Sequence, residues 1–178
     1  MSWRPAFWLV AAAVVIVDQV TKQIALVNLD RGRQYPLIGD LLSFELVFNS
    51  GAAFSLGRDY TWILTVVAIL VTGALIFYAR RAQSTGVVWL FGIALGGAIG
   101  NLIDRLFRAP GVGEGHVVDM INYGNQFVGN VADIAIVGAA AAAVLWGLLG
   151  KPLLDPVPGS SEDTSSATSE DHPVEHRE

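Results

Sequence analysis

The stretch HVVDMINYGNQFVGNVADIAIVGAAAAAVLWGLL, residues 116–149, joins a polar segment that contains Asp119 to an apolar run that carries Asp133 near its start. The run, residues 131–149, is nearly long enough to cross a hydrocarbon core, which takes about 20 helical residues. A carboxylate at the mouth of a membrane helix is costly to keep. The stretch therefore predicts a membrane helix with a functional acid at its entrance.

The whole chain has the composition of a membrane protein. Of its 178 residues 53% are hydrophobic and 15% are charged, and the mean hydropathy is +0.51. The hydrophobic fraction and the mean hydropathy are higher, and the charged fraction is lower, than in an ordinary soluble domain. The first apolar run contains Asp18 and Lys22 in place of a small-residue cleavage site, so we expect it to be retained and not removed as a signal peptide. The predicted spans are residues 6–27, 60–79, 86–107 and 131–149.

Four spans place both termini on the same side of the membrane. The short link between the second and third spans holds Arg80 and Arg81, and the positive-inside tendency predicts that this side is cytoplasmic. Arg4 and Lys151 agree with that orientation. A count of all basic residues leaves the orientation open, because others would lie at or beyond the opposite face: Lys22, Arg31, Arg33, Arg58, Arg105 and Arg108.

Two segments lie outside the spans. Residues 28–59 contain apolar residues at alternate positions, Leu42, Phe44, Leu46 and Phe48, which predicts a small extracytoplasmic β element. Residues 153–178 are rich in Ser, Pro, Asp and Glu and predict a disordered acidic cytoplasmic tail after a membrane domain of residues 1–152. The tail accounts for the net charge of −5, and the rest of the chain is close to neutral, so nucleic-acid binding is not expected. The predicted fold class is thus an all-α integral membrane protein, a four-transmembrane-helix bundle with a small β element.

Small residues indicate how the spans pack. Gly92, Gly96 and Gly100 recur every four residues and form a glycine stripe along one helix face. Such a stripe lets a neighbouring helix approach closely. The alanine run at 139–143 in the fourth span is suited to the same role. We therefore expect a compact bundle.

Two groups of polar residues lie at membrane depth. Asp18 and Lys22 are four residues apart, so they either neutralise each other near the outer interface, with Lys22 extending outward, or position a substrate. Asn101, Asp104 and Arg105 follow one edge of the third span near its end. These residues could simply be the polar end of a helix. Because they lie beside the glycine stripe, we favour the interpretation that they form a site facing the bundle interior.

A structural role alone can explain Asp133, but it does not explain Asp119. Asn130 can cap the fourth helix, and Asp133 is then its third residue, where the helix dipole favours a negative charge. Asp119 lies between apolar neighbours. If the segment folds back so that the two carboxyl groups meet, one can hold a proton while the other activates water, as in aspartic proteases.

Other chemistries fit the chain less well. It has no cysteine, and His116 is the only histidine before the tail, so neither a metal site nor a cofactor is expected. Lys22 could activate a serine, but no nucleophile turn surrounds Ser43, Ser50 or Ser55. Two alternatives without hydrolysis stay open: a transporter or channel that uses the acids as a proton or cation path, and a scaffold that uses the glycine stripe to bind helices.

Five motifs together make the chain resemble the bacterial lipoprotein signal peptidases, also called signal peptidase II. They are DQVTK at 18–22, FNSGAAFS at 48–55, GGAIGNLIDR at 96–105, VVDMI at 117–121 and NVADIAI at 130–136. The resemblance extends over residues 10–149. It implies a four-helix aspartyl endopeptidase of the bacterial inner membrane, with both termini cytoplasmic and the active site near the outer leaflet.

The resemblance also implies roles for residues and ligands. Asp119 and Asp133 match the catalytic pair, and the implied substrate is a prolipoprotein whose cysteine carries diacylglyceryl, cleaved immediately before that cysteine. Membrane lipid and the cyclic peptide inhibitor globomycin are further expected ligands, and the enzyme is expected to act as a monomer. The loop at 106–118 is longer than the common family pattern. The predicted supporting residues are Asp18, Lys22, Asn49, Gly51, Asn101, Asp104, Arg105 and Asn130.

Overall fold

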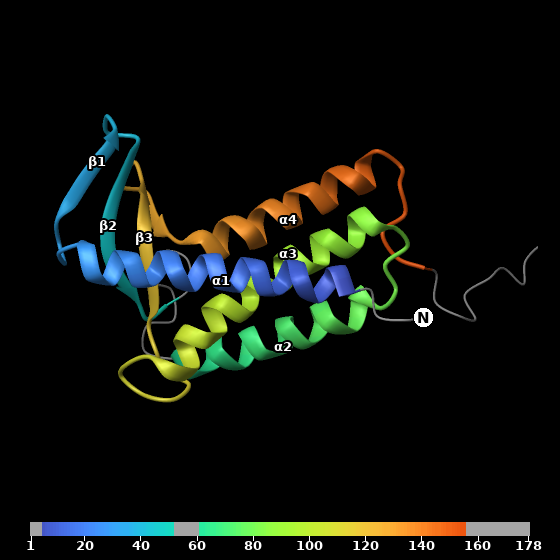
Figure 1. Ribbon diagram of the computed structural model, residues 1–178, viewed down its shortest axis with the longest axis horizontal. Coiled ribbons are helices and arrows are strands. Elements are labelled where there is room, and N and C mark those ends of the chain that lie inside the picture. Colours follow the sequence, from blue (N-terminus) through green and yellow to red (C-terminus); the bar gives the residue numbers. More distant parts are fainter. Residues whose placement is uncertain (1–4, 52–60, 156–178) are drawn as a thin grey trace, which may run out of the picture.

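Four helices and one small sheet make up the computed structural model, which describes residues 5–51 and 61–155. The sheet is antiparallel, has the order β1-β2-β3-β4 and lies at one end of the helices (Figure 1). All four helices are long and apolar enough to cross a membrane. The prediction of four apolar helices with a small β element is confirmed. The elements are α1 (Pro5–Asn28), β1 (Gln34–Ile38), β2 (Leu42–Asn49), α2 (Thr61–Ala79), α3 (Thr85–Phe107), β3 (Val117–Tyr123), β4 (Phe127–Gly129) and α4 (Val131–Leu148).

The sheet is larger than the sequence predicts. β1 and β2 come from the predicted element at 28–59, but β3 and β4 come from the segment before α4, whose glycines and asparagines indicate turns. β3 pairs with β2, with Asp119 opposite Val47, so Asp119 lies on a strand and not in a loop. Gly124 and Asn125 form the tight turn between β3 and β4, where both have positive φ. Gly124 and Asn125 are thus in a turn, whereas Gly129, a residue that also indicates a turn, lies in β4.

α3 is the central helix of the bundle, and α1, α2 and α4 all pack against it. α1 lies along the glycine stripe, so closely that a Cβ atom at Gly96 would come 2.6 Å from the Ala11 carbonyl oxygen. α4 lies against another face of α3, where a Cβ atom at Gly97 would come 2.5 Å from the Ala132 carbonyl oxygen. The predicted role of the stripe is confirmed, with α1 as the helix that approaches it.

α2 and α4 pack on different sides of α3, without extensive contact with each other (Figure 1). Of the alanine run at 139–143 only Ala139 is buried, and Val144 and Leu145 beyond it are exposed. The compact packing expected around this run is therefore not observed. The apolar outer faces of α2 and α4 are instead available to lipid.

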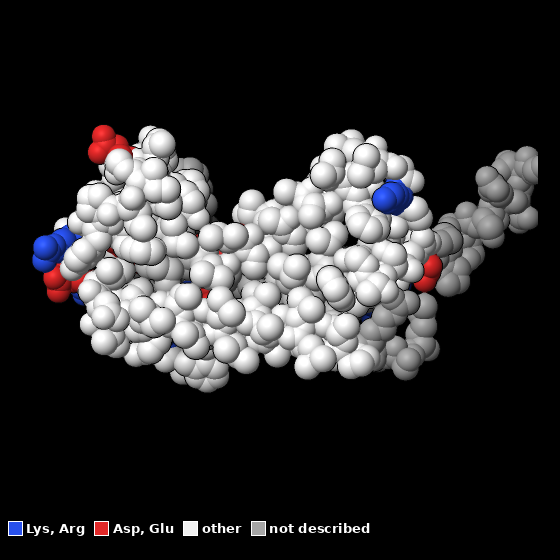
Figure 2. All heavy atoms as spheres, turned by 45° about the horizontal axis from the view of Figure 1, so that its top comes forward, with Lys and Arg blue, Asp and Glu red and all other residues white. Residues whose placement is uncertain are grey.

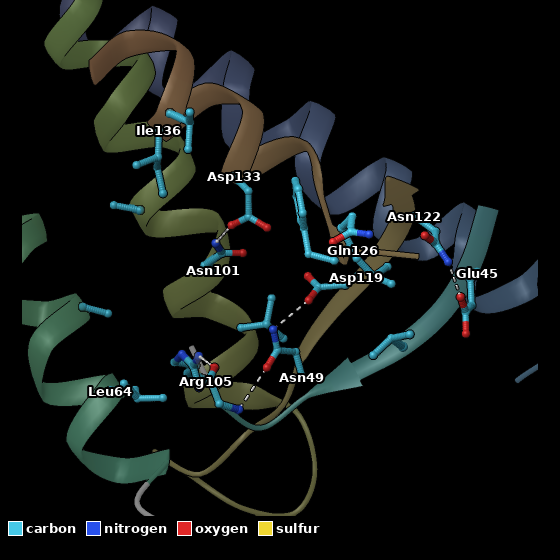
Figure 3. Close-up of a pocket in the computed structure, with 18 of the residues that line it drawn as sticks. Glu45, Asn49, Leu64, Asn101, Arg105, Asp119, Asn122, Gln126, Asp133 and Ile136 are labelled. Carbon is cyan, nitrogen blue, oxygen red and sulfur yellow. Dashed lines mark hydrogen bonds between the residues drawn. The ribbon is translucent and has the colours of Figure 1, made fainter. Parts of the chain in front are cut away.

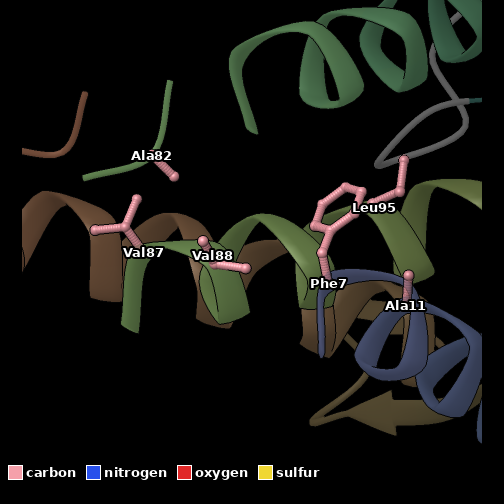
Figure 4. Packing of buried hydrophobic residues seen from close by; sticks show 6 residues of the cluster. All are labelled: Phe7, Ala11, Ala82, Val87, Val88 and Leu95. Carbon is pink, nitrogen blue, oxygen red and sulfur yellow. The ribbon is translucent and has the colours of Figure 1, made fainter. Parts of the chain in front are cut away.

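A cluster of buried apolar side chains lies at the end of the bundle away from the sheet. Its members come from α1, α3 and the link between α2 and α3 (Figure 4), and are Phe7, Ala11, Ala82, Val87, Val88 and Leu95. The same link binds the chain after α4, since the Gln83 N–H donates to the Leu153 carbonyl at 3.3 Å and the Asp155 N–H to the Arg81 carbonyl at 2.8 Å. Residues 153–155 of the predicted tail thus contact the bundle. The rest of the tail lies outside the described residues.

Charged side chains gather at the two ends of the molecule. The face in Figure 2 shows Lys, Arg, Asp and Glu at the sheet end and at the opposite end, with an almost uncharged surface between them. An apolar belt between two polar ends is the surface that a membrane-spanning bundle requires. The chain is therefore a membrane protein with four candidate spans.

Gly96→Ala is expected to lower the free energy of unfolding by about 1–3 kcal/mol, because overpacking forces two helices apart. The added methyl group would lie 2.6 Å from both the Ala11 carbonyl oxygen and Val14 Cβ. Gly138→Ala in α4 is the matched control, since a Cβ atom there meets nothing within 4 Å. Thermal unfolding in detergent micelles compares the two variants. Equal melting temperatures would contradict the close approach of α1 to α3.

Candidate active site

A cavity of about 870 Å³ is lined by the sheet and by α2, α3 and α4 (Figure 3). Asp119 from β3 and Asp133 from the first turn of α4 both line it. Apolar side chains of α2 and α4 form one part of the wall, and polar side chains of the sheet form another. The two aspartates lie between these parts.

Asn130 connects the two aspartates. Its side-chain oxygen accepts from the Asp133 N–H at 2.9 Å, and its own N–H donates to Asp133 Oδ2 at 3.1 Å, which completes a capping box at the start of α4. The side-chain nitrogen then points to Asp119, with Nδ2 2.6 Å from Oδ1. The predicted cap is confirmed, and the same buried residue also holds the second carboxyl group.

Lys22 sets the orientation of Asn101 on the other side of Asp133. The Lys22 ammonium donates to Asn101 Oδ1 at 2.9 Å, and an ammonium group can only donate. Asn101 must therefore turn its Nδ2 away from Lys22, and this nitrogen donates to Asp133 Oδ1 at 2.9 Å. Asn130 Nδ2 also donates to Asn101 Oδ1, at 3.1 Å. The amide orientations around Asp133 follow from the position of one buried charge.

A buried ion cluster behind the cavity holds this charge. Lys22 is completely buried and lies 2.8 Å from Asp18 Oδ2 and 2.9 Å from Asp104 Oδ2. Asp18 Oδ1 accepts the Ala132 N–H of α4 at 2.9 Å, and Asp104 Oδ2 accepts the Val118 N–H of β3 at 3.1 Å. The cluster therefore ties α1, α3, α4 and β3 together around the two aspartates.

The interpretation in which Lys22 extends outward to the interface is wrong, because the side chain is buried between two carboxylates. A direct contact with substrate is not supported either, since the described residues that line the cavity include Asn101 but neither Lys22, Asp18 nor Asp104. Of the three residues along the edge of α3, Asn101 and Arg105 face the cavity. The ion cluster supports the site from behind.

Sequence reasoning missed two members of the ion cluster. Arg108 donates from Nε to Asp104 Oδ1 at 2.6 Å, and its spacing of four residues from Asp104 is a signal that could have found it. Gln19 donates from Nε2 to Asp18 Oδ2 at 3.1 Å and to Asp104 Oδ1 at 3.3 Å. Nothing in the local pattern distinguishes Gln19 from an exposed polar residue.

Asn49 and Arg105 complete the site beside Asp119. Asn49 donates from Nδ2 to Asp119 Oδ2 at 2.9 Å, and its Oδ1 accepts the Gly51 N–H at 2.9 Å. Arg105 is 7% exposed and donates from Nη2 to the Gly51 carbonyl at 2.7 Å. Its Nη1 is buried and has no hydrogen-bond partner among the described residues. A buried cationic donor at the wall of a cavity can bind a carbonyl oxygen of a ligand.

Every residue that the sequence predicts for the site thus belongs to one continuous network of hydrogen bonds and ion pairs. Their assignment as catalytic or supporting residues stays a prediction. Those that line the cavity are Asn49, Gly51, Asn101, Arg105, Asp119 and Asp133.

Burial and the charge of Asp133 raise the pKa of Asp119 from its usual value of 3.8 to about 7. Burial is the larger cause, since Asp119 is 1% exposed. The hydrogen bonds from Asn49 and Asn130 act in the opposite direction, because they stabilise the carboxylate. Asp119 therefore keeps a proton up to about pH 7 beside the negative charge of Asp133.

Comparison with known proteins places this network in a family. Residues 10–149 match the family model described as signal peptidase (SPase) II. The chain belongs to the signal peptidase II family. Members of this family are peptidases. The carboxyl groups of Asp119 and Asp133 therefore lie in a peptidase. The matched residues contain the whole network, from Asp18 to Asp133.

Two curated relatives of the chain are bacterial proteins. The lipoprotein signal peptidase of Leifsonia xyli subsp. xyli is 45% identical over 142 residues, which cover 79% of this chain and 66% of that relative. The lipoprotein signal peptidase of Mycobacterium avium is 46% identical over 141 residues, which cover 79% and 78%. A solved structure described as a bacterial membrane enzyme is 26% identical with a TM-score of 0.72, and the match covers 83% of this chain and 90% of that one.

The stability of the protein is expected to fall as the pH rises from about 4 to about 7. Asp119 loses its proton near pH 3.8 in the unfolded chain and near pH 7 in the folded one, so the folded state binds more protons within this window. Each pH unit then lowers the free energy of unfolding by up to about 1.4 kcal/mol. Thermal unfolding of the wild type and Asp119→Asn across this pH range measures the effect.

Asp119→Asn lacks the titrating group, so its melting temperature relative to the wild type should rise with pH across the window. Titrating groups that do not interact with Asp119 contribute equally to both proteins and cancel in the comparison. Parallel pH profiles would contradict the raised pKa of Asp119.

Proposed function

We propose that the chain is a membrane aspartyl endopeptidase that removes the signal peptide from diacylglyceryl-modified prolipoproteins by cutting immediately before the lipidated cysteine. The observation that carries this proposal is a pair of carboxyl groups, the buried Asp119 and the half-buried Asp133, held by Asn130 at the wall of one cavity. Membership of the signal peptidase II family supports the class of substrate.

Asp133 is the base that activates water. It lies in the first turn of α4, where the helix dipole favours a negative charge, and it accepts hydrogen bonds from Asn101 and Asn130. A carboxylate held in this way can take a proton from a water molecule whose oxygen attacks the scissile carbonyl carbon. Asp119, which keeps a proton up to about pH 7, gives that proton to the carbonyl oxygen.

The tetrahedral intermediate then collapses without a covalent bond to the enzyme. The carbon–nitrogen bond breaks, and the proton that Asp133 took from water passes to the leaving nitrogen. As the new carboxyl group forms, one hydroxyl group of the intermediate returns its proton to Asp119. The products are a carboxyl group on the signal peptide and an amino group on the lipidated cysteine. Arg105 supports this reaction, because its unpartnered Nη1 at the cavity wall can donate to a peptide carbonyl oxygen.

The apolar part of the cavity suits the lipid of the substrate. It is lined by Leu64, Val67 and Val71 of α2 and by Ile136 and Val137 of α4. These two helices lie on different sides of α3, so acyl chains can enter between them from the bilayer. The scissile amide then lies where the apolar wall meets the carboxyl pair.

The proposed orientation places both termini in the cytoplasm of a bacterium and the sheet and active site toward the outer leaflet of the inner membrane. Arg80 and Arg81 in the short link between α2 and α3 support it, because they lie at the end away from the sheet. The proposed division is a membrane domain of residues 1–152 and a tail from residue 153. One chain supplies both carboxyl groups, which supports action as a monomer.

The alternatives without hydrolysis have less support. A proton or cation path distributes its acids over several depths, whereas Asp18, Asp104, Asp119 and Asp133 meet in one network beside the sheet. The glycine stripe is covered by α1, so that face of α3 is not free to bind another protein.

Purified protein in proteoliposomes tests the proposal. A synthetic prolipoprotein with a diacylglyceryl cysteine is expected to be cut once, directly before that cysteine, as determined by mass spectrometry of both products. The same peptide without lipid should be a much poorer substrate, and globomycin should inhibit the reaction. Cleavage at another bond, or equal cleavage of the peptide without lipid, would contradict the proposed function.

A further inference from the structure

The cavity extends from Asp119 over the sheet, where its lining becomes polar. In Figure 3, Glu45 and Asn122 lie on the opposite side of Asp119 from Leu64 and Ile136. The proposed hydrolysis uses none of the polar residues in this part of the wall. We call the group the sheet shelf and define it as Gln34 of β1, Glu45 of β2, Asn122 of β3 and Asn125 of the turn before β4.

Glu45 is the centre of the sheet shelf. Its Oε2 accepts from Gln34 Nε2 at 3.0 Å and from Asn122 Nδ2 at 2.5 Å. Asn122 is 2% exposed, and its Oδ1 accepts the Asn125 N–H at 2.9 Å, so three strands and a turn hold the group in place. Glu45 Oε1 has no hydrogen bond with a described residue. The shelf is therefore preorganised and still has an acceptor for a ligand.

The charge of Glu45 is not balanced within the described part of the chain. The ion pairs there join Lys22, Arg33 and Arg108 to other carboxylates, and none includes Glu45. A carboxylate at the wall of a cavity without a countercharge attracts cations and repels anions there. This part of the cavity therefore favours a ligand with a Lys or Arg side chain and disfavours one with Asp or Glu.

We propose that the sheet shelf is a specificity site for the first residues of the mature lipoprotein, in which Glu45 favours Lys or Arg and disfavours Asp or Glu. The inference rests on the proposed function. The signal peptide and the acyl chains are apolar, so they stay in the membrane and contact the helices. The segment after the cysteine leaves the membrane and therefore crosses the sheet.

The position of Glu45 along β2 predicts where the preference falls. Glu45 precedes Asn49 by four residues, and Asn49 donates to Asp119 at the carboxyl pair. At about 3.3 Å per strand residue, this separation is roughly 13 Å. An extended peptide with the same rise per residue covers it with the fourth or fifth residue, counting the lipidated cysteine as the first.

Diacylglyceryl-modified peptides with Lys, Gln or Glu at each of the second to fifth positions test the inference. For the wild type, kcat/KM is expected to be about 5-fold higher with Lys than with Glu at the fourth or fifth position, a ratio in the range of a partly exposed ion pair. Glu45→Gln should reduce this ratio to less than about 2-fold. The ratio is measured within one enzyme, so a general loss of activity cancels. Asp40→Asn, which removes an exposed acid from the turn between β1 and β2, is the control and should keep the wild-type ratio.

A wild type without a Lys-to-Glu preference at any of these positions, or an unchanged ratio in Glu45→Gln, would overturn the inference. In both cases cleavage and its dependence on Asp119 would persist, whereas failure of the proposed function would show as no cleavage of any peptide. If Glu45→Gln does not fold, the wild type alone decides. Its ratio should fall as salt rises from about 50 to about 500 mM, and a ratio independent of salt would overturn the role of charge.

Discussion

Asp119→Asn and Asp133→Asn are each expected to lower kcat for cleavage of a diacylglyceryl-modified prolipoprotein by about 10³-fold or more. Asparagine has nearly the size of aspartate but neither holds nor accepts the transferred proton. The two side chains share the Asn130 contact, so each variant removes one half of a pair that acts together. Single-turnover cleavage of a synthetic lipidated substrate measures the rate.

Folding of these variants needs its own control. Circular dichroism in micelles should show the helix content of the wild type for both, because asparagine can still accept the capping hydrogen bond of Asp133 and the helices are stabilised mainly by their apolar residues. Asp40→Asn removes an exposed acid from the same sheet and should retain wild-type activity. Full activity of either purified active-site variant would eliminate the proposed acid–base roles.

Lys22→Met is expected to lower the free energy of unfolding by about 3–5 kcal/mol, the cost of an uncompensated buried charge. Lys22 is completely buried and is the shared partner of Asp18 and Asp104, so its loss leaves two buried carboxylates facing each other. Methionine keeps much of the volume, so the effect reports charge and not a cavity. Equilibrium unfolding in mixed micelles gives the free energy.

Arg33→Met is the matched control for this prediction. Arg33 also pairs with an aspartate, Asp30, but both side chains are more than two-thirds exposed and 3.6 Å apart. An exposed pair of this kind contributes at most about 1 kcal/mol. A variant with Asp18→Asn and Asp104→Asn added to Lys22→Met should recover part of the lost stability. Equal losses for Lys22→Met and Arg33→Met would contradict the structural role of the ion cluster.

The helices could be predicted from the sequence because span length and apolar composition are local properties. The glycine stripe also identified a close helix contact, and Asn130 identified the start of α4. β3 was not predictable in this way, since it forms by pairing with β2 across a long sequence separation. The arrangement of α2 and α4 around α3 depends on which helix faces pack together. The sequence of a helix that is apolar on all sides does not reveal its packing face.

The site, like the fold, could be predicted from the sequence only in part. Residue types and the family motifs identified the carboxyl pair and its asparagines, which the fold brings into one network. Burial of Lys22 was not predictable, because an acid and a base four residues apart look the same on an exposed helix and on a buried one. Glu45 was not predicted as part of the site, because it is one of the residues that alternate with apolar ones in a strand pattern. Its role in the cavity appears only once the sheet is placed over the helices.

Cleavage rates of the wild type, Asp119→Asn, Asp133→Asn and the double variant on one lipidated substrate decide whether the two carboxyl groups act as a unit. If they share one proton during catalysis, the double variant should be no more than a few-fold slower than either single variant, because the first substitution already removes the function of the pair. A near wild-type rate in one single variant, or losses that multiply in the double variant, would show that the two carboxyl groups do not work together.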